Sequence, residues 1–336
     1  MRKEKVFIIA EAGVNHNGRL SLAKRLVDAA KACGADAVKF QTFNADDLAV
    51  ESAPKAGYQK AGTKRFSTQY QMLKKLELTS ADFRELAGYC RKKRITFISS
   101  PFDLKSIDVL KKLRVGIVKI PSGEITNLPY LRKVGALRRK IILSTGMATL
   151  GEVLKSLKVL VSSGTKKRDI TVLQCHTAYP TDDSDANLRA MSAIRDTCKV
   201  GVGYSDHTVG IDIALAAAAL GARVIEKHVT LDRKMPGPDH RASLDPAELK
   251  KLVEGVRRIE KALGSPVKRP SRIELRNRRA VRKSIVAAKD IKKNELFSKD
   301  NITVKRPAGG MGPERWDEII GKSACKDFRK NEMIRL

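Results

Sequence analysis

A repeat of strand-like and helix-like segments constrains the fold of this chain more than any other feature. Eight short runs rich in β-branched residues recur, and each is followed after a loop by a helical pattern. Their near-continuous apolar character, with little alternation, is typical of strands covered on both faces. The runs are VFIIAEA (6–12), DAVKFQT (36–42), ITFISS (95–100), GIVKI (116–120), KIILSTG (140–146), DITVLQC (169–175), VGVGYSD (200–206) and ARVIEKH (222–228). Eight such units in about 260 residues match the size of a (β/α)8 barrel, so we predict an α/β fold of that architecture.

The segments between the runs have the signals of amphipathic helices. In LSLAKRLVDAAKAC (20–33), apolar residues recur every three to four positions and so share one face. The segment at 245–264 begins with Asp245 as a predicted N-cap and Pro246 at the first helical position. A doubly wound open sheet is the structural alternative. It usually has fewer repeats and a glycine-rich first turn, which EAGVNHNG (11–18) does not match.

The pattern changes after residue 265. A basic, proline-containing stretch predicts a linker, and short strands and turns follow it. The remaining tail, about 65 residues long, is too small for a large core. We therefore predict a barrel domain over residues 1–265, a linker over 266–276 and a compact β-rich domain over 277–336.

The chain is strongly basic, with 67 Lys and Arg against 37 Asp and Glu and a net charge of +30. Nucleic-acid binding is one interpretation, since clustered cations neutralise phosphates, and residues 266–336 hold 20 Lys and Arg against 9 Asp and Glu. Aromatic residues are only 5%, however, and they do not alternate with the cations as a base-stacking surface requires. We favour a basic surface that attracts anionic substrates, with no specific nucleic-acid partner.

Cysteine usage and hydropathy point to the cytoplasm. The five cysteines are widely spaced, with no CxxC pair, which favours reduced thiols over a disulfide framework or a zinc ribbon. No apolar run approaches the ~20 residues of a membrane span, and Glu11 interrupts the first one too early for a secretory signal. We predict a cytoplasmic protein with no membrane partner.

Polar residues cluster where the predicted strands end, and in a barrel of this kind that face carries the active site. Lys39 and Lys119, with nearby serines, offer the charge and neutral donors that a phosphate-bearing ligand needs. His207 and His228 end neighbouring strands and could meet at one divalent metal. The serines are Ser100, Ser122, Ser144 and Ser205, and the candidate polyol acceptors or general bases are Glu11, Glu124 and Asp239.

Each of these residues also has an ordinary structural explanation. A lone lysine is more often an ion-pair partner, a lone serine a helix cap and a lone histidine a satisfied structural group. The occurrence of such polar residues at the ends of all eight predicted strands favours an active site over these separate structural explanations. We interpret Glu226 as a buried structural carboxylate that orients a histidine, and His240, beyond the last strand, as less significant than Asp239.

Several motifs together resemble the sialic acid synthase family, the phosphoenolpyruvate-dependent N-acetylneuraminate and legionaminate synthases. The resemblance covers almost the whole chain, and the combination of SDHT (205–208) with EKH and PGPDH (226–240) is specific. It implies a TIM barrel followed by an antifreeze-like SAF domain, in a domain-swapped homodimer where each SAF domain covers the active site of the partner. The other motifs are IIAEAGVNHNG, ADAVKFQTF, SSPFD, KIPSGEITNLP, ILSTGMATLGE and VKRPAGGMGP.

The resemblance also implies roles for individual residues. The phosphoenolpyruvate-binding positions correspond to Lys39, Ser100, Lys119, Ser122, Ser144 and Ser205. The metal ligands correspond to His207 and His228, with Mn²⁺ as the usual ion and Mg²⁺ or Co²⁺ as alternatives. The positions that hold the acylamino sugar correspond to Glu11, Gln41, Tyr179, Asp239 and, from across the dimer, Arg306. Glu124, with Glu11, corresponds to the acid or base of the reaction.

The implied reaction condenses phosphoenolpyruvate with an acylamino hexose to give a nine-carbon 2-keto acid and phosphate. N-acetylmannosamine is the first expectation for the sugar. The alternatives are the diacetamido-trideoxy hexoses that lead to legionaminate or pseudaminate. Two segments, LQCHTAYPTDDSDANL (173–188) and RPAGGMGP (306–313), depart from the usual family pattern. The enzymatic rival on the same fold is a Schiff-base aldolase with Lys119 or Lys39 as the nucleophile.

Overall fold

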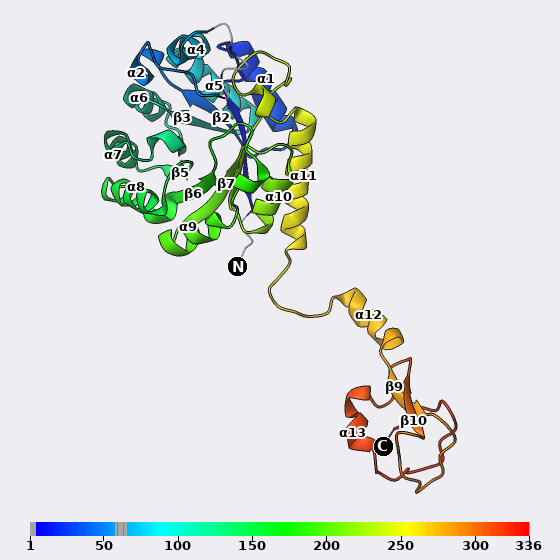
Figure 1. Ribbon diagram of the computed structural model, residues 1–336. Helices are drawn as coiled ribbons and strands as arrows, with labels where there is room; N and C mark the ends of the chain where they lie inside the picture. Colours follow the sequence, from blue (N-terminus) through cyan, green and yellow to red (C-terminus); the bar gives the residue numbers. More distant parts are fainter. Residues whose placement is uncertain (1–4, 58, 60–62, 64–65, 336) are drawn as a thin grey trace. The chain divides into compact units, whose positions relative to one another are not determined.

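The computed structural model describes residues 5–57, 59, 63 and 66–335. Contacts divide the chain into two compact units, one ending at Gly264 and one beginning at Ser265. Figure 1 shows the strands of the first unit surrounded by helices. No helix in the described part of the chain is long and apolar enough to cross a membrane.

In the first unit, strands β1 to β8 run parallel and close into a barrel in chain order, which confirms the predicted fold class. The strands are β1 (Phe7–Gly13), β2 (Ala37–Thr42), β3 (Thr96–Pro101), β4 (Ile117–Ile120), β5 (Lys140–Ser144), β6 (Ile170–Cys175), β7 (Gly201–Asp206) and β8 (Val224–His228). Each lies within two residues of the predicted run at both ends. The β-branched runs were therefore sufficient to locate every strand of the barrel.

Helices follow the strands and cover the outside of the barrel (Figure 1). They are α1 (Leu20–Ala32), α2 (Ala45–Leu48), α4 (Gln69–Leu76), α5 (Ser80–Lys93), α6 (Leu104–Lys112), α7 (Leu128–Ala136), α8 (Leu150–Ser162), α9 (Ala190–Cys198), α10 (Asp212–Ala219) and α11 (Pro246–Ala262). Helix α11 begins as predicted, because Asp245 accepts a hydrogen bond from Glu248 N at 2.9 Å in a capping box.

Side chains inside the barrel form layers that determine where the site lies. One layer is apolar and fully inside the ring of strands, and it consists of Ile9, Ala37, Ile98, Ile142, Leu173 and Val224. Because side chains of a strand alternate between faces, the next inward residue is two positions further along each strand. Those residues are Glu11, Lys39, Ser100, Ser144, Cys175 and Glu226. The layer nearest the carboxyl ends of the strands is therefore polar, and it forms the floor of a cavity.

The second unit is small and has its own core. Helix α12 (Arg272–Val281) begins inside the range predicted as a linker and buries none of its residues. Strands β9 (Ser284–Ala287) and β10 (Ile302–Lys305) pair antiparallel, and the short helix α13 (Trp316–Ile319) follows. The apolar core includes Ile285, Phe297, Ile302, Phe328 and Ile334.

Candidate active site

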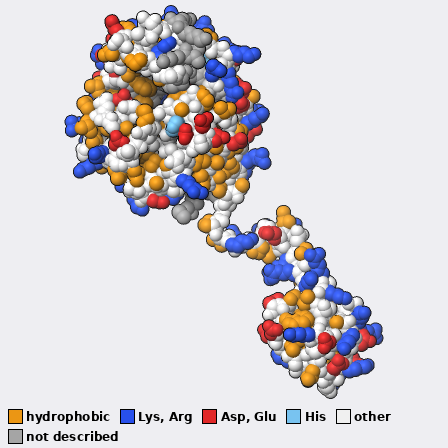
Figure 2. Space-filling model, in the orientation of Figure 1, with side chains coloured by type: hydrophobic (Ala, Val, Ile, Leu, Met, Phe, Trp, Pro, Cys, Tyr) orange, Lys and Arg blue, Asp and Glu red, His pale blue; other side chains and the backbone are white. Residues whose placement is uncertain are grey.

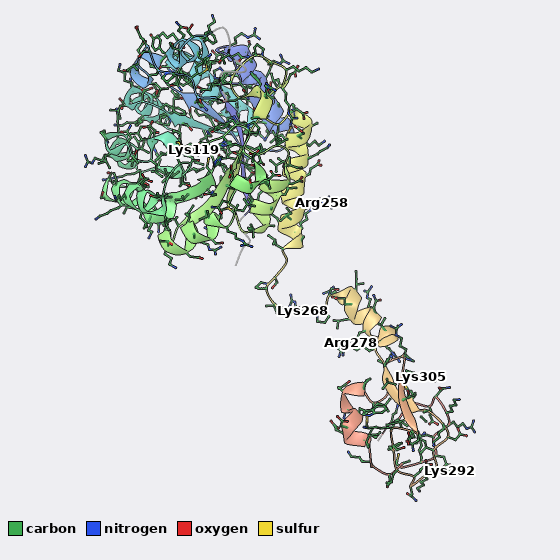
Figure 3. All side chains as sticks on the ribbon, in the orientation of Figure 1. Lys119, Arg258, Lys268, Arg278, Lys292 and Lys305 are labelled. Atoms are coloured by element: carbon green, nitrogen blue, oxygen red, sulfur yellow. The ribbon has the colours of Figure 1, made fainter. Side chains whose placement is uncertain are left out.

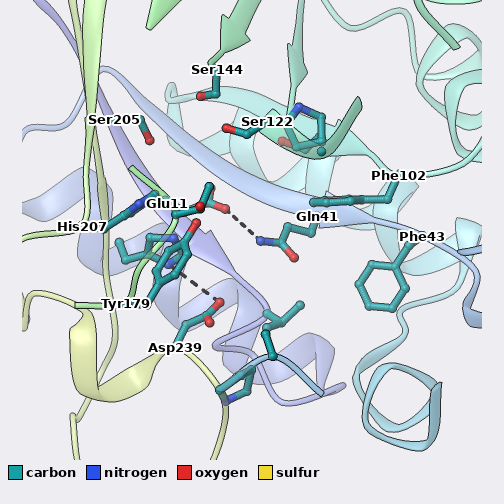
Figure 4. Close-up of a pocket in the computed structure, with 18 of the residues that line it drawn as sticks. Glu11, Gln41, Phe43, Phe102, Ser122, Ser144, Tyr179, Ser205, His207 and Asp239 are labelled. Carbon is teal, nitrogen blue, oxygen red and sulfur yellow. Dashed lines mark hydrogen bonds and ion pairs between the residues drawn. The ribbon is translucent and has the colours of Figure 1, made fainter. Parts of the chain in front are cut away.

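A cavity of about 450 Å³ opens at the carboxyl ends of the barrel strands. Most residues predicted for the site line it, and Figure 4 labels several of them together with Phe43 and Phe102, which were not predicted. The predicted residues among the lining are Glu11, Lys39, Gln41, Ser100, Lys119, Ser122, Ser144, Tyr179, Ser205, His207, His228 and Asp239. The cavity is therefore assembled from all eight strands or the loops that follow them.

Two lysines and two glutamates form the floor of the cavity. Lys39 Nζ lies 2.8 Å from Glu11 Oε2 and 3.7 Å from Glu226 Oε1, and Lys119 Nζ donates to Glu226 Oε1 at 3.1 Å. Strand register explains the first pair, since Glu11 lies directly opposite Lys39 between β1 and β2. Figure 3 shows Lys119 inside the barrel, whereas Arg258 lies on the outside.

Burial and neighbouring charge perturb all four of these groups. Burial raises the pKa of Glu226, but the charges of Lys119 and Lys39 outweigh it and lower that pKa to about 2. Burial lowers the pKa of Lys39, yet Glu11 and Glu226 more than offset this and raise it. The pKa of Lys119 is lowered, chiefly by burial and secondarily by the charge of Lys39. Burial, together with the charge of Glu226, raises the pKa of Glu11. The floor is therefore a set of buried ionisable groups held close together.

Glu226 is buried, as the sequence interpretation had it, but its hydrogen-bond partners differ from that interpretation. It orients no histidine among the described residues, and instead its Oε1 accepts from Lys119 and from Ser205 Oγ at 2.9 Å. Its Oε2 has no hydrogen-bond partner in the described structure. The sequence could have placed Glu226 in the cavity, because it lies two positions before His228 and so shares its face of β8.

The serines that line the cavity differ in whether their hydroxyls already have a hydrogen-bond partner within the protein. Ser100 accepts a hydrogen bond from Lys39 Nζ at 3.2 Å, and Ser122 accepts one from Gly146 N at 3.0 Å. Ser144 Oγ is buried and has no hydrogen-bond partner among the described residues. Since a buried hydroxyl is costly to leave unpaired, Ser144 is the serine of this set that is most open to a ligand oxygen.

His207 and His228 lie side by side, with ring centroids 5.4 Å apart, and Tyr179 packs against both. His207 Nδ1 lies 2.5 Å from the carbonyl oxygen of His176, which fixes the proton on Nδ1 and leaves Nε2 with its lone pair. Burial lowers the pKa of His207 to about 4 and that of His228 well below its usual range, so both rings are neutral at physiological pH. His228 Nδ1 has no hydrogen-bond partner in the described structure.

Two neutral imidazoles with free lone pairs fit a divalent metal, which binds the unprotonated ring. The described residues contain no group of three or more His, Cys, Asp or Glu side chains placed to hold an ion. The two histidines would therefore be the protein ligands of an open site, in which substrate and water complete the coordination.

Carboxylate and amide groups lie beside the histidines. Gln41 Nε2 donates to Glu11 Oε1 at 3.4 Å, and Asp239 Oδ2 lies 3.9 Å from His228 Nδ1. Burial and the charge of Glu11 raise the pKa of Asp239 to about 7. Gly13, at φ +50°, lets these groups converge, because an added Cβ would lie 3.3 to 3.6 Å from Glu11, Gln41 and Asp239. Sequence reasoning did not find Gly13 or the inward-facing Cys175.

Two predicted residues lie elsewhere. Glu124, in a 3-10 turn after β4, does not line the cavity, and its Oε2 accepts from Asn127 Nδ2 at 2.6 Å. Arg306 is an exposed residue of the second unit, and its Nε donates to Val281 O at 2.9 Å. His240, given less weight than Asp239 in the sequence analysis, does not line the cavity, and its Nδ1 lies 2.7 Å from Thr230 Oγ1.

The cavity lies at the carboxyl ends of the barrel strands, which is where enzymes of this fold have their active sites. The chain belongs to the NeuB family, whose model matches residues 26–268, and it carries a SAF domain over residues 282–336. This confirms the resemblance drawn from the motifs.

Individual relatives are synthases of nonulosonic acids. The chain is 53% identical to the N,N'-diacetyllegionaminic acid synthase of Campylobacter jejuni, over 99% of both chains. It is 48% identical to the corresponding enzyme of Legionella pneumophila, over 94% of this chain and 89% of that one. Among solved structures, the N-acetylneuraminic acid synthetase of Leptospira borgpetersenii, in complex with citrate, is 36% identical with a TM-score of 0.73. That match covers 81% of this chain and 90% of the other.

Proposed function

We propose that this synthase condenses phosphoenolpyruvate with a 2,4-diacetamido-trideoxy hexose to form a diacetylated legionaminic acid. The identity of 53% over nearly the full length to a N,N'-diacetyllegionaminic acid synthase carries this proposal. The N-acetylneuraminic acid synthetase of known structure is only 36% identical. The alternative sugar considered from the sequence is therefore better supported than N-acetylmannosamine, the first expectation.

Phosphoenolpyruvate binds at the floor of the cavity in this proposal. Lys39 and Lys119 supply positive charge to its phosphate and carboxylate, and the serine hydroxyls supply neutral donors. Ser144, which has no partner in the described structure, donates to one of the ligand oxygens. Glu226 holds both ammonium groups in place, so their charge is positioned before the ligand arrives.

The acylamino sugar binds with its C1 aldehyde at His207 and His228. Their neutral rings would hold a divalent cation, which we expect to be Mn²⁺ and which would supply Lewis acidity to the aldehyde oxygen. C3 of phosphoenolpyruvate forms the new bond to C1, and the aldehyde oxygen takes up a proton to become a hydroxyl. Water adds its oxygen at C2 and loses a proton, and cleavage of the bond between C2 and the phosphate-bearing oxygen releases phosphate and leaves the C2 keto group. Glu11 is better placed than Glu124 to accept the proton of that water, because Glu11 lines the cavity and Glu124 does not.

The experiment measures phosphate release with phosphoenolpyruvate and Mn²⁺ against N-acetylmannosamine and the two diacetamido-trideoxy hexoses. We expect the sugar with the legionaminate configuration to give the highest kcat/KM. If none of the three sugars leads to phosphate release, the synthase reaction is refuted for this protein. Borohydride trapping with a keto acid tests the Schiff-base rival, and covalent labelling of Lys119 or Lys39 would favour it.

The metal proposal has its own test. Chelation should abolish turnover, and Mn²⁺ should restore it. His207→Ala and His228→Ala should each lose Mn²⁺ binding, measured directly by isothermal titration calorimetry, while the unfolding transition persists. Mn²⁺ affinity that is unchanged in either variant would remove that histidine from the proposed metal site.

We also propose that Arg306 acts in the active site of a partner subunit. Mixing the His207→Ala and Arg306→Ala variants tests this, because each heterodimer would contain one site with both native residues. Activity of the mixture well above that of either variant alone would support the exchange. A mixture no more active than the separate variants would exclude it.

The basic charge does not require a nucleic-acid partner. On the face seen in Figure 2, Lys and Arg side chains are scattered over both units rather than gathered in one patch. We therefore expect any DNA binding to vanish at physiological salt, as binding by charge alone does. Sequence-dependent binding that persists at 150 mM salt, roughly the physiological ionic strength, would contradict this.

A further inference from the structure

One side of the cavity is apolar, in contrast to its charged floor. We call this side the apolar wall, and its residues are Phe43, Leu48, Met72, Leu73, Leu76 and Phe102. They form a small hydrophobic cluster of their own, separate from the layers of the barrel, and come from the loops after β2 and β3 and from α2 and α4. Phe43 and Phe102 contact each other edge to face, with ring centroids 6.5 Å apart. The wall is therefore a packed surface that faces the cavity.

The apolar wall lies across the cavity from the proposed metal corner. Figure 4 shows Phe43 and Phe102 on one side, His207 and Tyr179 on the other, and Gln41 between them. A sugar whose C1 lies at the histidines would pass Glu11 and Gln41 with its middle carbons. Its far end, C4 to C6, would then reach the apolar wall.

The six side chains of the apolar wall, all Phe, Leu or Met, offer no hydrogen-bond donor to that far end. The amides of Gln59 and Gln69, which also line the cavity, already bond to each other, with Gln69 Nε2 3.5 Å from Gln59 Oε1. Gln59 Oε1 also accepts from Ala56 N at 3.0 Å. A hydroxyl placed against the phenyl and leucine side chains would lose its bonds to water without replacement.

We infer that the apolar wall selects a deoxygenated sugar end, with the C6 methyl and the methyl of the 4-acetamido group packed against it. This inference rests on the proposed function and names the residues that set its substrate class. N-acetylmannosamine carries hydroxyls at both C4 and C6, whereas the trideoxy sugar carries none there. Apolar pockets discriminate such differences by roughly 10- to 200-fold, so we expect a preference of about that size.

The test compares the two sugars in wall variants. Leu73 is partly buried on α4, and Leu73→Gln adds an amide that can bond a sugar hydroxyl. We expect the ratio of kcat/KM for the trideoxy sugar to that for N-acetylmannosamine to fall about 10-fold, mainly through KM. Leu154→Gln, the same change at a side chain 41% exposed on α8, should leave the ratio unchanged. Phe102→Tyr gives a second variant that keeps the ring if Leu73→Gln fails to fold.

The possible outcomes separate this inference from the proposed function. If the wild-type protein releases phosphate with neither sugar, the synthase proposal itself fails. If the wild-type protein is active but both wall variants keep the native ratio, the wall has only a structural role and the synthase reaction stands. A wild-type preference for N-acetylmannosamine would also overturn the inference.

Discussion

Strands β7 and β8 carry two clusters of buried charge on opposite faces, and the clusters differ in how completely they are paired. On the inner face, Glu226 accepts from Lys119 and Ser205, but its Oε2 has no partner in the described structure. On the outer face, Lys227 Nζ donates to Asp206 Oδ2 at 2.6 Å and to Thr208 O at 2.7 Å.

In the outer cluster, the hydrogen bonds of Asp206 and Lys227 join these two residues to each other and to Thr208. Asp206 Oδ1 accepts from both the backbone and the hydroxyl of Thr208, so every oxygen of that carboxylate is used. Lys227 and Asp206 are each only 1% exposed. Because both carboxylate oxygens of this buried pair are used inside the protein, Asp206 has no free acceptor for a ligand, and removing either partner would leave an uncompensated buried charge. The inner cluster has unused atoms that face a cavity, and this difference separates a binding site from a structural ion pair.

Lys119→Met should have the largest effect on activity. In the proposed reaction it removes a cation that binds phosphoenolpyruvate, so we expect kcat/KM for phosphoenolpyruvate to fall by about 10³-fold. Stability should fall less than in the Lys227→Met variant described next, because Lys39 Nζ lies only 3.7 Å from Glu226 Oε1 and remains as its cationic partner. Steady-state kinetics and urea denaturation measure the two effects. Normal kcat/KM in this variant would show that the inner cluster is structural too.

Lys227→Met should show the opposite pattern. It leaves Asp206 buried without its cation, which costs about 3–5 kcal/mol of unfolding free energy. Lys234→Met, at an exposed lysine in the loop after β8, should stay within about 0.5 kcal/mol. The double variant Asp206→Asn/Lys227→Met should recover part of the loss, since no unpaired charge remains. Equal unfolding midpoints for Lys227→Met and Lys234→Met would mean that the outer pair contributes nothing.

The sequence predicted the barrel and most of the cavity because both follow from local periodicity. A β-branched run identifies a strand, and the polar residue at its end then lies at a known face. The sequence analysis interpreted Glu226 as a structural carboxylate, although counting by two from His228 places Glu226 on the inner face of β8 and Lys227 on the outer face.

Other features could not be found from local pattern. All of the apolar wall except Phe102 comes from the long connection after β2, where no strand signal fixes which face Phe43 or Leu73 presents. Glu124 follows a strand like the other candidates, but a 3-10 turn carries it away from the cavity lining. The convergence of Glu11, Gln41 and Asp239 depends on the backbone of Gly13 and on contacts distant in sequence.

Ser144→Ala should have the smallest effect of these variants. It tests whether an unpaired atom inside the barrel belongs to a ligand site and not to the fold. Ser144 Oγ has no partner in the described structure, so its removal should change the free energy of unfolding by less than about 0.5 kcal/mol. A hydrogen bond to a charged ligand is worth about 1.5–3 kcal/mol, so KM for phosphoenolpyruvate should rise by at least about 10-fold. Ser205→Ala is the matched control, because Ser205 Oγ already donates to Glu226 and its loss should lower stability as well. If Ser144→Ala lowers the free energy of unfolding and leaves KM for phosphoenolpyruvate unchanged, this hydroxyl stabilises the fold. A ligand contact predicts a higher KM and unchanged stability.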